Sequence, residues 1–230
     1  MTGASPRAGR VFAAARDLVL EHGVRKVTIA EIAQAAGVGK GTVYLYWPTK
    51  EDLVLALFAR DLLACVEDVV RALADDPSLV MPRRLAPLLV RTALGRPLSR
   101  RLHTGDVDAL RLLAQHAADR EVFDRADASA LSYGVLPILR AHGLVRADRP
   151  VLHQAYTVHA LLTGFIATEA GRVTGPLPVG NAEEILAETV HVLLEPGVDP
   201  PPDVVAAAAT EAVASLNVAA AALAEIAGPG

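Results

Sequence analysis

The chain has 230 residues, a formal net charge of −4, and 52% hydrophobic but only 4% aromatic residues. A core of alanine, leucine and valine favours helices, and the near absence of aromatic alternation argues against strands. The single cysteine, Cys65, excludes an intrachain disulfide and a cysteine-based zinc site; it indicates a reducing cytoplasm and is predicted to be buried. The longest uncharged stretch, residues 150–168, contains two histidines, so no membrane span is predicted.

The charges are unevenly distributed along the chain. Residues 1–60 carry eight Lys and Arg against five Asp and Glu, whereas residues 61–230 carry fourteen against twenty-one. All three lysines, Lys26, Lys40 and Lys50, lie in the first of these segments. This asymmetry predicts a small basic domain that faces DNA, attached to an acidic body that repels the DNA backbone.

The first predicted helix covers residues 7–22, and residues 28–47 then have the pattern of a helix-turn-helix. Thr28 and Glu31 have the spacing of a capping box. The apolar side chains that follow Thr28 recur at the spacing of one helix face. Gly37 ends this helix, because glycine reaches the left-handed cap conformation at little steric cost.

The second helix of the pair is predicted to bury Val43. The side chains that point outward are a cation and three hydroxyls, the groups that bond phosphate oxygens and base edges: Lys40, Thr42, Tyr44 and Tyr46. Gly41 keeps the start of this helix slim, so that it can approach a groove closely. Trp47 is expected in the core of the domain. A helix-turn-helix pattern alone is weak evidence, since any helical hairpin has it, so the flanking residues matter.

Seven further helices are predicted from the apolar periodicity and from the Gly and Pro breaks between them: residues 51–73, 79–94, 99–115, 120–142, 150–173, 182–194 and 203–227. Thr49 caps the first of these helices. Gly134 and Pro137 predict a kink in the fourth. The last segment is alanine-rich; we expect it to dock on the body as an extra helix, and a loose segment is the alternative.

Taken together, these residues resemble the TetR family of bacterial transcriptional repressors. The resemblance covers residues 9–60 and depends on Val11, Phe12, Ala14, Ala15, Leu18, Gly23, Val27, Thr28, Ile29, Ile32, Ala33, Ala36, Gly37, Val38, Gly41, Thr42, Val43, Tyr44, Tyr46, Trp47, Lys50, Glu51 and Leu53. The helical remainder is also similar to that family's regulatory domain. The resemblance implies an all-α fold, in which a three-helix helix-turn-helix DNA-binding domain is followed by a helical ligand-binding and dimerisation domain.

The expected DNA-binding residues are Thr28, Lys40, Gly41, Thr42, Tyr44, Tyr46 and Lys50. The resemblance implies that Thr28, at a helix N-terminus, touches a phosphate, and that Thr42, Tyr44 and Lys50 contact the DNA backbone. We predict that Lys40 reads a base, because lysine can donate to guanine N7 and O6; a phosphate or solvent contact is the alternative. Tyr46 stands where the family often has histidine.

Small residues recur along one face of the helix predicted over residues 150–173 and let two helix backbones come close. In the family, the two penultimate helices of each subunit form a four-helix dimer seam, and here the second of them is residues 182–194. An isologous contact of this kind gives a twofold dimer. The expected interface residues are Ala160, Gly164, Ala167, Gly171, Ile185 and Val190; close packing of the small residues within the monomer is the alternative.

The sequence contains no glycine-rich phosphate loop, serine nucleophile elbow, zinc-binding His-Glu-x-x-His run or cysteine cluster. We therefore predict no enzymatic activity, no catalytic residue, no metal site and no cofactor. A ligand pocket in an otherwise aliphatic body needs a few polar or aromatic groups that orient the ligand. The candidates are His103, Phe123, Tyr133, Tyr156 and His159.

The sequence thus predicts a DNA-binding domain over residues 5–65, a ligand-binding and dimerisation domain over 66–200, and an alanine-rich segment over 201–230. We expect a cytoplasmic homodimer that binds double-stranded DNA at a palindromic operator and responds to an unidentified small molecule, with no membrane partner. Repressors and activators share this pattern, and we predict a ligand-released repressor. The alternatives are an enzyme with its active site in the helical body and a helical interaction protein whose hairpin binds another protein.

Overall fold

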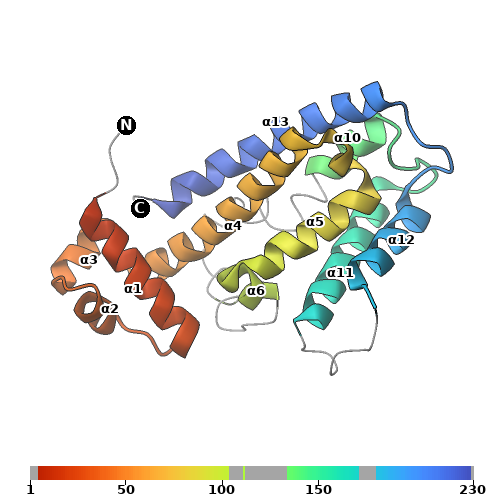
Figure 1. Ribbon diagram of the computed structural model, residues 1–230. Coiled ribbons are helices and arrows are strands. Elements are labelled where there is room, and N and C mark those ends of the chain that lie inside the picture. Colours follow the sequence, from red (N-terminus) through yellow and green to blue (C-terminus); the bar gives the residue numbers. More distant parts are fainter. Residues whose placement is uncertain (1–4, 104–110, 112–133, 171–179, 229–230) are drawn as a thin grey trace.

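The computed structural model describes residues 5–103, 111, 134–170 and 180–228. Regular structure in these residues is helical, with no strand among them (Figure 1), so the predicted all-α fold is confirmed. The elements in chain order are α1 (Pro6–His22), α2 (Ile29–Ala35), α3 (Lys40–Tyr46), α4 (Lys50–Asp75), the 3-10 turn η1 (Pro77–Val80), α5 (Pro82–Gly95), α6 (Pro97–His103), α10 (Leu136–Ala141), α11 (Val151–Glu169), α12 (Ala182–Leu194) and α13 (Pro202–Ala227).

The helix ends follow from local side-chain chemistry. A capping box opens α4: the Asp52 amide donates to Thr49 Oγ1 at 3.0 Å, and the Thr49 amide donates to Asp52 Oδ2 at 2.9 Å. Beyond α4, the Ser78 amide donates to Asp76 Oδ1 at 3.0 Å and starts η1, which confirms the predicted break. Gly143 follows α10 with φ +72°, in the left-handed region that glycine enters easily.

Helices α4 and α13, of 26 residues each, form a long pair that spans the molecule. Helix α4 leads away from α1, α2 and α3, and α13 returns alongside it, so that the chain ends beside the α1–α3 unit (Figure 1). The face of α13 that packs on α4 is mostly alanine, with Leu216 and Leu223 only 4% and 0% exposed. The alanine-rich segment is therefore a docked helix, as predicted.

Helix α13 is also the one helix among the described residues that is long and apolar enough to cross a membrane. In the most apolar part of this helix, 28% of the residues are buried in the structure. A single helix of this kind is weak evidence for a membrane protein, and the buried face of this one packs on α4.

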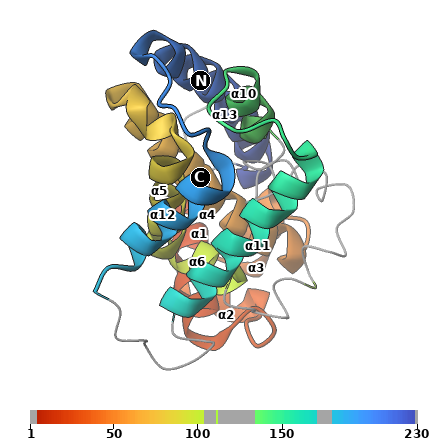
Figure 2. The same ribbon diagram turned by 90° about the vertical axis from the view of Figure 1, so that its right-hand side faces the viewer.

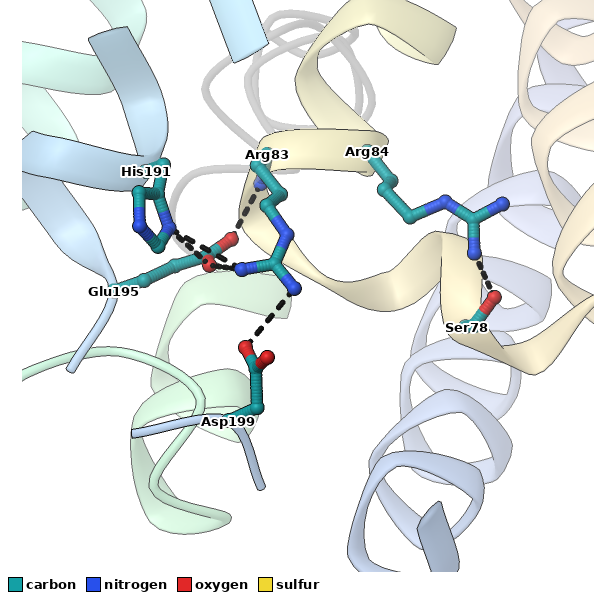
Figure 3. A network of polar contacts seen from close by, with 6 residues as sticks. All are labelled: Ser78, Arg83, Arg84, His191, Glu195 and Asp199. Atoms are coloured by element: carbon teal, nitrogen blue, oxygen red, sulfur yellow. Dashed lines mark hydrogen bonds and ion pairs between the residues drawn. The ribbon is translucent and has the colours of Figure 1, made fainter. Parts of the chain in front are cut away.

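Helices α5, α11 and α12 form the other side of the body, with α11 and α12 at the front of Figure 2. A polar network fixes the end of α12 against the start of α5 (Figure 3). Its centre is the Glu195 carboxylate, only 1% exposed, which accepts from the Arg83 amide at 2.7 Å and from Arg83 Nη1 at 2.8 Å. His191 Nδ1 lies 2.8 Å from the same carboxylate, and Arg83 Nη2 donates to Asp199 at 3.0 Å.

Two of the predicted helices fall largely outside the described residues. Of residues 99–115, the structure describes α6 as far as His103, and residue 111. Of residues 120–142, it describes those from Gly134 onward, where the chain makes a wider, π-type turn before α10 begins at Leu136. The helical path therefore changes close to the predicted kink.

Candidate DNA interface

Helices α1, α2 and α3 pack around a small common core. Phe12 of α1, Ile32 of α2 and Val43 of α3 are all buried, at 7%, 0% and 0% exposure. Trp47, which follows α3, is 3% exposed, as expected for a core residue. Its ring lies at a tilt against Phe12 and Tyr46, with centroid separations of 6.2 and 5.7 Å. This core holds α2 and α3 in a fixed relation, so that the turn between them presents one face of α3 to solvent.

A capping box opens α2, as predicted. The Glu31 amide donates to Thr28 Oγ1 at 3.3 Å, and the Thr28 amide donates to Glu31 Oε2 at 2.9 Å. The hydrogen bonds from the Thr28 side chain and backbone lower the pKa of Glu31, so this carboxyl stays ionised where the helix dipole favours negative charge. The Thr28 hydroxyl is exposed and lies 2.8 Å from Glu31 Oε2. A DNA phosphate that engaged this hydroxyl would have to displace that bond.

One face of α3 is open to solvent along its whole length. Because successive residues turn by about 100° around a helix, Lys40 and Tyr44 lie on one line of this face, and Gly41 and Leu45 lie on the next. All four are exposed, with Tyr44 at 50% and Leu45 at 82%. This face combines a cation, a phenol and an aliphatic side chain around a glycine. Lysine can donate to guanine, and an aliphatic side chain can pack against the thymine methyl group.

Leu45 was missed by the sequence reasoning, which looked for polar groups. A signal was nevertheless present, because Leu45 lies two residues beyond the buried Val43 and hence about half a turn around the helix. A large aliphatic side chain at 82% exposure has no role in the packing of the domain.

Thr42 and Tyr46 lie on the opposite flank of α3 from Lys40 and Tyr44, and both are only partly exposed. The Tyr46 hydroxyl lies 2.7 Å from Ser5 Oγ, at hydrogen-bond distance. The structure thus places Tyr46 where it ties α3 to the residue before α1, away from the open face of the helix.

Lys50 lies at the start of α4, close to the N-terminal end of α2. Its ammonium group donates to the Arg25 carbonyl oxygen at 3.5 Å, and its charge contributes to the lowered pKa of Glu31. The structure therefore brings Lys50 and Thr28 together on one side, while Lys40, Gly41 and Tyr44 lie on the open face of α3.

A second candidate site is a small cavity in the body, of about 40 Å³. The described residues that line it are all apolar and come from α5, α10, α11 and α12, together with the residue before α10: Pro82, Leu85, Ala86, Leu89, Val135, Leu136, Leu139, Val158, Leu161, Leu162, Val190 and Leu194. Nowhere in the described residues do three or more His, Cys, Asp or Glu side chains gather as a metal site would require.

Of the predicted pocket residues, the structure describes the side chains of Tyr156 and His159, and neither lines this cavity. Tyr156 is 74% exposed on the outer face of α11, so the structure does not bear out its predicted place in a pocket. His159 is partly buried, and its Nδ1 is buried and has no hydrogen-bond partner among the described residues. Of His103 the structure describes only the position at the end of α6, and Phe123 and Tyr133 lie outside the described residues. The aliphatic character of the described lining agrees with the expectation of an aliphatic body, and the few polar or aromatic groups expected beside it are not among the described lining residues.

The outer faces of α11 and α12 expose an unusual number of large apolar side chains. These are Leu152 and Tyr156 on α11, at 63% and 74% exposure, and Ile185, Val192 and Leu193 on α12, at 42%, 68% and 37%. We call these five residues the outer apolar face.

Of the predicted interface residues, Ile185 belongs to the outer apolar face. Ala160 and Gly164 of α11 are also exposed, and Ala167 is partly exposed. The prediction that Val190 lies at the dimer interface was wrong: Val190 is 2% exposed and lines the cavity, so it packs within the monomer. Gly171 lies outside the described residues.

Comparison with known proteins identifies the class to which this geometry belongs. A family model described as bacterial regulatory proteins, tetR family, matches residues 11–57, which hold most of α1, all of α2 and α3, and the start of α4. An uncharacterized HTH-type transcriptional regulator of Mycobacterium bovis is 38% identical over 61 residues, which are 26% of this chain and 32% of that protein. That match thus spans about a third of the relative's length. A second regulator described in the same words, from the same organism, is 28% identical over 191 residues, 74% of this chain and 91% of that protein.

Among solved structures, the fatty acid degradation regulator FadR from Bacillus halodurans has a TM-score of 0.57 at 19% identity, over 86% of this chain and 98% of that one. The FadR of Bacillus subtilis, in complex with stearoyl-CoA, has a TM-score of 0.55 at 16% identity, over 83% and 99%. At these identities the likeness shows a shared fold. Residues 11–57 thus match the TetR family of bacterial regulatory proteins, and the fold of the chain is similar to that of the FadR regulators.

Proposed function

We propose that the protein is a cytoplasmic, sequence-specific DNA-binding repressor that acts as a homodimer on a palindromic operator and is released by a small apolar ligand. The observation that carries this proposal is the open face of α3, with Lys40, Tyr44 and Leu45 exposed on a helix whose opposite face is buried. The excess of basic residues over residues 1–60, on an otherwise acidic chain, supports DNA as the partner.

Distinct roles are proposed for the residues of this interface. Lys40 donates to guanine in the major groove, and Leu45 packs against a thymine methyl group beside it. Gly41 lets the helix approach the groove closely. Tyr44, Thr42, Thr28 and Lys50 contact phosphates, which position the helix without reading sequence. Tyr46 contributes through its bond to Ser5, which holds α3 against α1.

The outer apolar face supports the proposed dimer. Exposed apolar side chains grouped on two neighbouring helices are typical of interaction sites in soluble proteins. A Cβ atom added at Gly164 would meet nothing within 4 Å in the monomer, so the small residues on α11 leave room for a partner helix. A twofold dimer would place its two α3 helices in successive major grooves, about 34–36 Å apart.

The aliphatic cavity supports an apolar ligand. It lies between α5, α10, α11 and α12, so a ligand that enters it would move helices that carry the outer apolar face. Release from DNA follows if the ligand binds more tightly to the dimer geometry in which the α3 helices no longer match the operator spacing. Long-chain acyl compounds, stearoyl-CoA among them, are suitable first probes because their hydrocarbon chains match the lining.

Variants separate the proposed roles. Lys40→Ala should relax base preference at one position of each half-site, whereas Lys50→Ala should weaken binding to all sequences alike. Gly164→Leu should split the dimer, and Gly180→Leu, at another exposed glycine with open space around it, should not. Anisotropy titrations with matched and mismatched duplexes and sedimentation velocity measure these effects. If Lys40→Ala and Lys50→Ala keep the same base specificity as each other, the division of roles between the two lysines is contradicted. If Gly164→Leu sediments with the mass of the unaltered protein, the proposed dimer interface is contradicted.

A further inference from the structure

The C-terminal end of α13 meets the DNA-binding unit. Ala227, the last residue of α13, is 3% exposed, and Gly228 follows it with φ +63°, a conformation that favours glycine. A Cβ atom added at Gly228 would lie 3.9 Å from Trp47 Nε1. The end of α13 is thus packed against the core residue that follows α3, and Figure 1 shows this end of the helix beside the α1–α3 unit.

One side chain joins these parts. Arg60 belongs to α4, and its guanidinium carbon lies 3.9 Å from the centroid of the Phe12 ring of α1. Its Nη2 also lies 3.4 Å from the carbonyl oxygens of both Ala227 and Gly228. Arg60 therefore contacts α1 on one side and the end of α13 on the other, while Phe12 in turn packs against Trp47.

Each of these contacts suits an arginine. A guanidinium over an aromatic face is attracted by the ring quadrupole. The last carbonyl groups of a helix carry partial negative charge and have no partner within the helix, so a cation beside them is favourable. The two carbonyl contacts are long for hydrogen bonds, which fits one N–H group shared between two oxygens.

We propose that Arg60 is a positioning residue for DNA binding: it latches the α1–α3 unit to α4 and to the end of α13, and so fixes the angle of α3 relative to the body. This inference rests on the proposed function. Without the latch, the unit would still be held to the body by the contact of α1 with α4 and by the hydrogen bond from Arg101 of α6 to the Leu20 carbonyl oxygen of α1. In a dimer, the angle of each unit sets the distance between the two α3 helices, so a loosened latch should make the protein tolerant of altered half-site spacing.

The experiment that tests this role compares three variants with the unaltered protein: Arg60→Ala, Arg60→Lys and a chain that ends after Glu225. Arg71→Ala is the matched control, since Arg71 is exposed, lies on the same helix and forms an ion pair with Asp68 of that helix at 2.9 Å. Affinity is measured on the protein's selected operator and on versions with the half-sites moved by one and two base pairs. Arg60→Ala and the shortened chain should bind the best operator roughly tenfold more weakly, about 1.4 kcal/mol, and should discriminate less between spacings. Arg60→Lys should recover part of the spacing selectivity.

Trp47 gives a second measurement that needs no DNA, because it is the only tryptophan in the sequence. Loss of the latch should increase quenching of its fluorescence by acrylamide, with unchanged helix content by circular dichroism. If quenching and spacing selectivity match the Arg71→Ala control, the latch is refuted. If affinity falls equally at every spacing, Arg60 serves stability alone and the positioning role is refuted. If the unaltered protein selects no DNA, the proposed function and the positioning role both fail, while the quenching result still decides whether the latch forms.

Discussion

The Glu195 network at the junction of α5 and α12 gives a quantitative test of the packing. Its carboxylate accepts from the backbone and the guanidinium of Arg83 and lies at hydrogen-bond distance from His191 (Figure 3). Glu195→Gln preserves the shape of the side chain but leaves one acceptor oxygen and introduces an NH₂ group. With the side chain 1% exposed, water cannot replace the lost bonds. In the variant, one of the Arg83 N–H groups that donate to the carboxylate in the unaltered protein must remain unsatisfied or face the new NH₂ group.

The expected loss is smaller than for a fully buried ion pair. Breaking such a pair by removal of one partner costs about 3–5 kcal/mol. Arg83 is 33% exposed and keeps its contact with Asp199, so solvent and that carboxylate offset part of the loss. We therefore expect the free energy of unfolding to fall by about 2 kcal/mol. For a chain of this size, that corresponds to a decrease in Tm of about 4–8 °C.

The assay is thermal and urea unfolding followed by circular dichroism, at one fixed protein concentration because a dimer's Tm depends on it. The matched control is Arg91→Ala, which removes the ion pair with Glu183 between the same two helices, where both side chains are about half exposed. That pair should contribute less than about 1 kcal/mol. If Glu195→Gln destabilises no more than Arg91→Ala, the reasoning from burial is refuted.

Three further predictions concern single residues. Burial raises the pKa of the Cys65 thiol to about 11, so in the folded protein it should react with iodoacetamide at pH 8 far more slowly than in urea; equal rates would contradict its burial. Thr28→Ala should lower the free energy of unfolding by about 1 kcal/mol at neutral pH. The folded pKa of Glu31 is lowered, so the stabilisation linked to its ionisation is present above its usual pKa of 4.5 and is lost as the pH falls below it. If Thr28→Ala lowers the free energy of unfolding by the same amount at low pH as at neutral pH, the capping box is contradicted. Leu45→Ala should leave Tm unchanged but weaken operator binding, and selective loss at an A·T pair would identify the base it contacts.

Much of the helical layout could be predicted because helix ends depend on neighbouring residues. The capping boxes at Thr28 and Thr49 and the glycine at 143 act within a few residues, and α12 begins and ends where its periodicity placed it. The helix against which α13 packs could not be predicted from the sequence. An alanine-rich face carries no information about which surface it covers, and only the folded chain brings it against α4.

The candidate sites also contain some residues whose positions the sequence predicts and others whose positions it does not. Lys40 and Tyr44 could be placed on the open face of α3 from helical spacing alone. The place of Tyr46 depends on Ser5, 41 residues earlier, and so could not be read locally. On α12, Val190 and Val192 are chemically identical, yet one is 2% and the other 68% exposed. Which of them faces inward depends on the packing of α12 against α5 and α11, which the periodicity of α12 does not specify.

The central claim is that the open face of α3 reads DNA as part of a twofold dimer. Its most direct test is the selection of bound duplexes from a random DNA pool by the purified full-length protein. The proposal predicts enrichment of an inverted repeat whose half-sites lie about one helical turn or slightly more apart, and loss of that enrichment with Lys40→Ala. A folded protein that enriches no sequence would contradict the proposal and favour a hairpin that binds another protein.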